Sequence, residues 1–278
     1  MIYKKLSVQL TPYNEDASQI MMAQLGECGF DTFTETETGF EAYAAADNVS
    51  PMFELAIVSV VEGVKVEWTM DDVEDQDWNQ QWEENSFKPI CIDGRCRIRS
   101  PYHEPDDSVE YEVVINPKMS FGTGYHETTT MMVKYIMEND MAQKVVLDMG
   151  CGTGILGILA SKRGAKHVDG VDIDEWSYRN AAENISLNGV GNMTPVLGGA
   201  EVLSGMGPYD VVFANINRNI LVRDMQQYCS VLKPEGCMFF SGFYSEDAPI
   251  VVAEAEKYGL RLVETKEQNN WNGLFMKR

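Results

Sequence analysis

The first seventy residues predict a small domain of alternating strands and helices. Residues 2–10 alternate apolar and polar side chains, as a half-buried strand does, and residues 15–28 place apolar side chains near helical spacing. The segment 48–51 is typical of a helix start, with Pro51 at the first helical position. The order βαββαβ predicts a ferredoxin-like α+β module. The expected elements are strands at residues 2–10, 30–38, 39–46 and 63–70, and helices at residues 15–28 and 52–61.

From residue 145 the pattern changes to that of a parallel sheet. A short apolar run at residues 145–149 is followed by glycines and then by an apolar run of helical length, which indicates a strand, a tight turn and a helix. Gly164 ends that helix, and residues 168–172 read as a second strand that ends in Asp172. This is the order of the first βαβ unit of a Rossmann-like α/β sheet, with a right-handed crossover.

Two strands at the C-terminus add a topological constraint. Residues 260–265 and 271–277 both have strand patterns, and only residues 266–270 separate them. A parallel crossover needs a dozen or more residues, so these two strands are expected to be antiparallel. A mostly parallel sheet with one antiparallel strand from the C-terminus is what S-adenosylmethionine-dependent methyltransferases have, and the standard dinucleotide-binding fold lacks it.

Charge divides the chain unevenly. The 278 residues include 22 Lys and Arg against 43 Asp and Glu, a net charge of −21, which argues against binding bare nucleic acid or an anionic membrane surface. Residues 1–87 hold 18 acidic residues and three lysines, a net −15. An acidic run at residues 71–77 marks a boundary, and Trp78 and Trp82 follow it four residues apart. We expect a substrate-recognition domain at residues 1–70, a linker at 71–90 and a larger α/β domain at 91–278.

Neither a metal centre nor a disulfide framework is predicted. The six cysteines include no C-x-x-C pair, and the chain has three histidines, so reduced buried thiols are the simpler interpretation. The N-terminus has two lysines but no apolar stretch of signal-peptide type, and no later window approaches 18 uncharged apolar residues. A cytoplasmic location with no membrane partner is expected.

The glycine-rich turn leaves two cofactor classes open. Residues 152–157 satisfy G-x-G-x-x-G, and Asp172 lies 20 residues after Gly152, as in a nicotinamide-dependent dehydrogenase. Both classes use a carboxylate at the end of the second strand to bind ribose hydroxyls, so Asp172 does not decide between them. A dinucleotide fingerprint starts directly after its strand, whereas here Asp148 precedes the G-x-G-x-G pattern of residues 150–154. Asp148 is expected at the strand's carboxyl end, near a ligand's ammonium group.

Two further segments are expected at the same edge of the sheet. A strand at residues 210–214 leads into Asn215, at the edge where open α/β sheets bind ligands, and Asn215 is well placed to hold a methyl-accepting amine. Upstream, a strand at residues 113–115 leads through a glycine-rich loop into an apolar helix at residues 131–137. Threonines such as Thr129 and the amides of that helix N-terminus are suited to holding a carboxylate.

These motifs together resemble the bacterial ribosomal protein L11 methyltransferases, the PrmA family. The resemblance rests on the loop N-P…F-G-T-G-x-H-x-T-T at residues 116–129, which is specific, and it covers the N-terminal domain by order and length only. One departure is Asn116, where the family commonly has Asp. The more generic cofactor motifs D-x-G-x-G-x-G-I-L, V-D-I-D and A-N-I follow at residues 148–156, 171–174 and 214–216.

The resemblance implies transfer of methyl groups from S-adenosylmethionine to lysine side chains and the α-amine of a large-subunit ribosomal protein. Asn215 is implied beside the transferred methyl. Because methyl transfer from a sulfonium needs chiefly in-line positioning of a neutral amine, no dedicated base is required. His126 is a candidate base, but a role in fixing loop geometry is favoured. The positions expected to contact the cofactor are Thr129, Asp148, Gly150, Gly152, Gly154, Asp172, Ala200 and Asn215.

Two alternatives stay open on the sequence. One is an S-adenosylmethionine-dependent methyltransferase that acts on another protein or a small molecule, and the other is an NAD-dependent dehydrogenase. A basic ribosomal protein is the expected partner, because the acidic first third of the chain suits a cationic surface. The protein is expected to act as a monomer.

Overall fold

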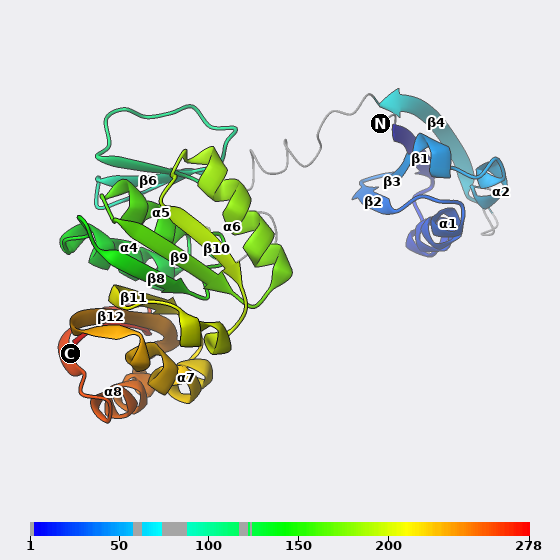
Figure 1. The fold of residues 1–278 in the computed structure, drawn as a ribbon. Helices are drawn as coiled ribbons and strands as arrows, with labels where there is room; N and C mark the ends of the chain where they lie inside the picture. Colours follow the sequence, from blue (N-terminus) through cyan, green and yellow to red (C-terminus); the bar gives the residue numbers. More distant parts are fainter. Residues whose placement is uncertain (1–2, 58–62, 74–87, 117–121, 123) are drawn as a thin grey trace. The chain divides into compact units, whose positions relative to one another are not determined.

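The chain divides into two compact units, Met1–Trp82 and Glu83–Arg278. The computed structural model describes residues 3–57, 63–73, 88–116, 122 and 124–278. Each unit has its own sheet (Figure 1). Most of the expected linker, including Trp78 and Trp82, and residues 58–62 of the expected second helix lie outside the described residues.

The N-terminal unit is a four-stranded antiparallel sheet with the order β2-β3-β1-β4. This is the arrangement that the βαββαβ order predicts. Leu6, Val8 and Phe40 point to one face of the sheet, where they pack with Met21 and Leu25 of the first helix in a solvent-free core. The elements are β1 (Tyr3–Thr11), α1 (Glu15–Glu27), β2 (Thr32–Thr36), β3 (Gly39–Ala45), α2 (Phe53–Ala56) and β4 (Lys65–Val73).

The larger unit is built on a seven-stranded sheet with the order β10-β9-β8-β11-β12-β14-β13. All of its strands run parallel except β14, which is antiparallel to both neighbours. The expected antiparallel C-terminal strand pair and the Rossmann-like sheet are thereby confirmed. The strands are β8 (Val145–Met149), β9 (His167–Asp172), β10 (Met193–Leu197), β11 (Tyr209–Asn215), β12 (Leu232–Tyr244), β13 (Arg261–Gln268) and β14 (Trp271–Lys277).

Helices cover both faces of this sheet (Figure 1). On one face α4, α5 and α6 share a core with a small sheet of order β5-β6-β7, and on the other face α7 and α8 pack together around buried residues such as Leu221 and Phe240. Within the described ranges, no helix is long and apolar enough to cross a membrane. These elements are β5 (Ile90–Ile92), β6 (Cys96–Arg99), β7 (Tyr111–Val114), α4 (Glu127–Glu138), α5 (Ile155–Lys162), α6 (Glu175–Leu187), α7 (Arg218–Ser230) and α8 (Ala248–Glu256).

Candidate active site

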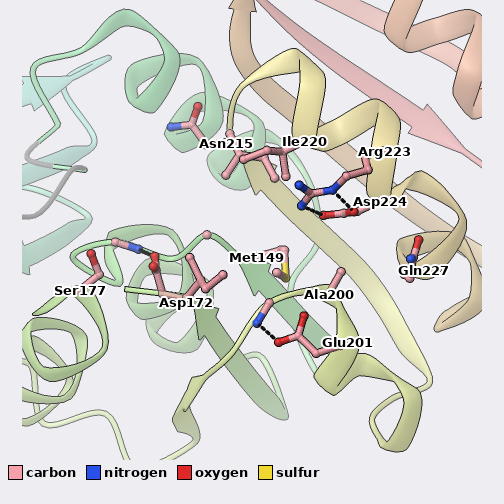
Figure 2. Close-up of a pocket in the computed structure, with 15 residues that line it drawn as sticks. Met149, Asp172, Ser177, Ala200, Glu201, Asn215, Ile220, Arg223, Asp224 and Gln227 are labelled. Atoms are coloured by element: carbon pink, nitrogen blue, oxygen red, sulfur yellow. Dashed lines mark hydrogen bonds and ion pairs between the residues drawn. The ribbon is translucent and has the colours of Figure 1, made fainter. Parts of the chain in front are cut away.

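Three parallel strands end at one edge of the sheet around a pocket of about 600 Å³. Met149, Asp172 and Asn215 are the last residues of β8, β9 and β11, and all three line the pocket. Open α/β sheets bind ligands at this carboxyl edge. The lining, shown in Figure 2, consists of Met149, Gly150, Gly152, Asp172, Ile173, Ser177, Gly199, Ala200, Glu201, Asn215, Ile216, Ile220, Arg223, Asp224 and Gln227.

The glycine-rich turn between β8 and α5 brings backbone to the pocket wall. Gly150 has a φ of +69°, and a Cβ atom on it would lie 2.4 Å from Cγ2 of Ile216. A side chain at this position is therefore excluded both by the left-handed backbone and by the neighbouring loop. At the other end of the turn, Gly154 caps α5 in a left-handed conformation. The turn thus offers peptide groups, rather than side chains, to a ligand.

Asp172 is held rigidly at the end of β9. Its Oδ2 accepts a hydrogen bond of 2.8 Å from the backbone N–H of Gly152, and its Oδ1 accepts one of 3.0 Å from the N–H of Asp174. The side chain is 9% exposed. Because each carboxylate oxygen has two lone pairs, both oxygens keep acceptor capacity that faces the pocket. This arrangement suits a ligand with two adjacent hydroxyl groups.

Next to Asp172 the pocket has an apolar part with a polar rim. Ile173 is 77% exposed and lines the pocket together with Ala200 and Ile220. The carboxylate of Glu201 accepts a 2.7 Å hydrogen bond from the N–H of Gly199, which lowers the pKa of Glu201. A flat apolar ring with polar edges fits such surroundings.

Asp148 lies beneath the turn and does not line the pocket. It is completely buried, and its Oδ2 accepts a 2.9 Å hydrogen bond from the N–H of Gly157 in the first turns of α5. Burial, with a smaller contribution from the charge of Asp172, raises the pKa of Asp148 to about 7. The geometry supports a role in fixing α5 against β8, and a contact with a ligand's ammonium group stays a prediction.

The N-terminus of α4 is capped by His126. The Nδ1 atom of His126 accepts a hydrogen bond from the N–H of Thr128 at 3.3 Å and lies 2.8 Å from the Thr128 hydroxyl. The imidazole also packs edge-on against Trp271, with ring centroids 4.6 Å apart. In the same helical turn the hydroxyl of Thr129 is fully buried and finds no hydrogen-bond partner among the described residues.

Asn215 stands where β11 gives way to the loop before α7. The next residue, Ile216, donates its N–H to the carbonyl of Ser241 at 3.1 Å, and Asn217 caps α7 by accepting from the N–H of Ile220. Both ends of this short loop are therefore anchored. The Oδ1 atom of Asn215 is buried and has no hydrogen-bond partner in the described part of the chain. It is an acceptor without a donor, in a residue that lines the pocket.

Helix α7 supplies pocket residues that the sequence did not indicate. Asp224, which is 6% exposed, accepts two hydrogen bonds from Arg223, one from Nε at 2.6 Å and one from Nη2 at 2.7 Å. This pair and Gln227 line the side of the pocket that faces Glu201 (Figure 2). No motif marks these positions, because they reach the site only through the packing of an amphipathic helix on the sheet.

The unusual Asn116 has a local explanation. Its side-chain Nδ2 donates to Oε1 of Glu183 at 2.9 Å. An aspartate at this position would place a second carboxylate beside Glu183, and like charges at hydrogen-bond distance repel. The amide donor therefore matches the acidic neighbour on α6.

The structure gathers part of the expected site in one pocket. His126, Thr129, Asp148 and Gly154 do not line it, although all four lie on the elements that surround it. No cluster of three or more His, Cys, Asp or Glu residues that could hold a metal ion occurs within the ranges given above. The expected residues that do line the pocket are Gly150, Gly152, Asp172, Ala200 and Asn215.

The chain is similar to one protein family over almost its whole length. The profile of the family "Ribosomal protein L11 methyltransferase (PrmA)" matches residues 7–278. Proteins named ribosomal protein L11 methyltransferase from Bacteroides fragilis and Porphyromonas gingivalis are 44% identical over 274 residues and 43% identical over 262 residues. These matches cover 98% and 94% of this chain, and 98% and 90% of the relatives.

A solved structure agrees with the sequence matches. The crystal structure of ribosomal protein L11 methylase from Lactobacillus delbrueckii subsp. bulgaricus superposes with a TM-score of 0.62 at 28% identity, and the match covers 68% of this chain and 98% of that one. The family match carries the cofactor and the reaction class with it. The chain belongs to the ribosomal protein L11 methyltransferase (PrmA) family of S-adenosylmethionine-dependent protein methyltransferases.

Proposed function

We propose that this chain methylates amino groups of ribosomal protein L11, both lysine side chains and the N-terminal α-amine, in the pocket at the carboxyl edge of the sheet. Family membership decides against the dehydrogenase and the small-molecule alternatives. The observation that carries the proposal is the presence of Asp172 and Asn215 in one pocket, the first with its carboxylate fixed by backbone and the second with a buried acceptor.

The pocket fits S-adenosylmethionine. Asp172 is suited to the two ribose hydroxyls, Ile173 and Ala200 to the adenine ring, and the peptide groups from Gly150 to Gly152 to the methionine part. The cofactor contact expected of Thr129 stays a prediction, because its buried hydroxyl has no hydrogen-bond partner among the described residues but does not line the pocket. When bound, S-adenosylmethionine supplies a methyl group on a positively charged sulfur. The positive charge makes the methyl carbon electrophilic.

Asn215 holds the accepting amine. Its Oδ1 is buried and has no donor among the described residues, so it keeps acceptor capacity for a neutral amine that enters the site. That bond turns the nitrogen lone pair toward the methyl group, and positioning of this kind provides most of the rate in a direct transfer. Partial burial of a lysine side chain lowers its pKa, which favours the neutral form without a protein base.

His126 acts by positioning. Its Nδ1 is engaged with the N–H and hydroxyl of Thr128, so this nitrogen does not face the pocket, and its ring packs on Trp271. The capping bond fixes the first turn of α4, which also carries Thr129. This geometry supports the loop-fixing role over the role of a general base.

The N-terminal unit captures the protein substrate. Its helices cover one face of the sheet, while the other face exposes hydroxyl and carboxylate side chains such as Thr34, Glu67, Thr69 and Asp71. Residues 1–70 hold 11 acidic residues and three lysines, a net charge of −8, which is complementary to a basic protein and steers its approach. We assign this role to residues 1–70, joined by the linker at 71–90 to the methyltransferase domain at 91–278, in a cytoplasmic and monomeric enzyme.

Peptide mapping by mass spectrometry tests the amine assignment. The purified chain is incubated with S-adenosylmethionine and ribosomal protein L11, and the product is digested and sequenced. Methyl groups on lysine side chains and on the N-terminal amine are expected. Methylation only at carboxylate, arginine or cysteine side chains would contradict the proposal, and Asn215→Ala serves as the control for contaminating activity.

A further inference from the structure

Helix α6 carries a row of asparagines that the proposed function does not use. Asn180 and Asn184 of α6 and its C-cap Asn188 recur every fourth residue, so they lie along one face, and the first two are 3% and 0% exposed. Asparagine is a weak helix former. Two buried asparagines in one helix indicate a specific role for their amide groups.

The side chains of these asparagines bind the backbone at the free edge of β7, as a neighbouring strand would. Four helical residues rise about 6.0 Å, close to the roughly 6.6 Å between alternate residues of an extended chain. Asn188 accepts from the N–H of Val114 at 2.9 Å and donates to its carbonyl at 2.6 Å, while Asn184 accepts from the N–H of Asn116 at 2.9 Å. Asn180 donates to the carbonyl of Asn116 at 3.0 Å.

Asn184, unlike Asn188, also contacts the glycine-rich turn. Its Nδ2 donates to the carbonyl of Thr153 at 2.9 Å, within the glycine-rich turn of the pocket. Thr153 is fully buried, and its hydroxyl donates to the carbonyl of Gly122 at 2.7 Å. Asn184 and Thr153 therefore connect the turn to Asn116 on one side and to Gly122 on the other.

The connection is tight enough to transmit a displacement. A Cβ atom on Gly122 would lie 2.7 Å from the hydroxyl oxygen of Thr153, and one on Gly154 would lie 3.4 Å from Cβ of Ala181 on α6. The first distance leaves no room for a side chain between Gly122 and Thr153, and the second is an ordinary van der Waals contact between the turn and α6. Loss of the Asn184 amide leaves the buried carbonyl of Thr153 and the partly buried N–H of Asn116 without their partner, and the backbone shifts to satisfy them.

We propose that Asn184 and Thr153 are positioning residues that set the cofactor turn relative to Asn116 and Gly122, and thereby set the affinity for S-adenosylmethionine. The inference rests on the proposed role of residues 150–152 in holding the cofactor. Neither residue lines the pocket, so both act through the turn. Asn188 bonds Val114 of β7 and donates to the backbone carbonyl of Asn184 at 2.8 Å, but it does not touch the turn, and its role is structural.

Calorimetric titration of the full-length chain with S-adenosylmethionine tests the proposal. Asn184→Ala is expected to weaken binding about tenfold, whereas Asn188→Ala changes it by less than about twofold although it also lowers the melting temperature. All titrations are run where circular dichroism shows each variant fully folded. Equal affinities for these two variants would overturn the proposal. Failure of the wild type to bind would instead overturn the proposed function.

A second pair of variants keeps the test valid if Asn184→Ala does not fold. Thr153→Val keeps the shape of the side chain but removes the hydroxyl that binds Gly122, and Thr153→Ser restores that hydroxyl. Binding is expected to weaken at least about threefold in Thr153→Val and to stay near the wild-type value in Thr153→Ser. Wild-type affinity in Thr153→Val would show that the connection does not set the cofactor site. An equal loss in both variants would show that packing, and not the hydrogen bond, matters, and would overturn the proposal as well.

Discussion

Replacement of Asp172 by alanine separates the cofactor role of this carboxylate from its structural role. In the free protein the carboxylate accepts hydrogen bonds from the backbone of Gly152 and Asp174. Asp174 is exposed, so water can replace its bond, but Gly152 is buried. The unpaired N–H of Gly152 is expected to cost about 1–3 kcal/mol of folding free energy. For a domain of this size each kcal/mol lowers the melting temperature by about 2–4 °C.

The loss of affinity is a separate quantity. Hydrogen bonds from ribose hydroxyls to a charged carboxylate contribute about 1.5–3 kcal/mol, so Asp172→Ala is expected to weaken S-adenosylmethionine binding roughly 10- to 150-fold. Asp172→Asn keeps one acceptor oxygen and is expected to lose less.

Isothermal titration calorimetry measures the affinity, and Asp169→Ala is the matched control. Asp169 lies on the same strand and its carboxylate binds Tyr209 at 2.8 Å and His167 at 2.9 Å, but it does not line the pocket. The control is expected to lower stability and to leave the affinity unchanged. Undiminished affinity in Asp172→Ala, or an equal loss in Asp169→Ala, would refute the assignment of Asp172 to the ribose.

Three further predictions concern Asn215, Asp148 and the N-terminal unit. Asn215→Ala should reduce kcat more than it weakens cofactor binding, because a group that orients the amine acts on the transfer step; steady-state kinetics with equal losses in both would make it only a cofactor ligand. Asp148 has a pKa of about 7 in the folded state, against 3.8 when exposed. Between these values the folded protein holds a proton that the unfolded chain releases, so the free energy of unfolding decreases as pH rises from about 4 to 7. Asp148→Asn should remove this contribution and raise stability at pH 8 relative to the wild type, by up to about 4 kcal/mol; denaturant titrations with parallel pH profiles for both proteins would contradict it. Deletion of residues 1–82 should leave S-adenosylmethionine binding intact and abolish methylation of folded ribosomal protein L11; methylation of the same amines at the wild-type rate would show that the N-terminal unit has another role.

The sequence predicts those parts of the fold and site that depend on local pattern or on chain length. The order βαββαβ and the short connection between residues 265 and 271 leave few topologies, and the structure has the expected ones. Asp172 and Asn215 are found at strand ends because polar residues that follow an apolar strand mark the carboxyl edge of the sheet.

Other features depend on tertiary packing and carry no local signal. The helix expected at residues 131–137 begins at Glu127, because His126 caps a polar first turn that has no apolar periodicity. Strand β10 contains Pro195, which argues against a strand, and it forms because it lies at the edge of the sheet and pairs only with β9. The Arg223–Asp224 pair reaches the pocket through the placement of α7 on the sheet, which no motif encodes.

The central claim is that the pocket containing Asp172 and Asn215 transfers methyl groups to amines of ribosomal protein L11. Intact-mass spectrometry of that protein, incubated with S-adenosylmethionine and either the wild-type chain or Asn215→Ala, tests it most directly. The account predicts mass gains in whole methyl increments with the wild type, blocked when the substrate amines are acetylated beforehand, and strongly slowed with the variant. No mass gain with a wild-type chain that binds S-adenosylmethionine, or equal gains with both enzymes, would contradict it.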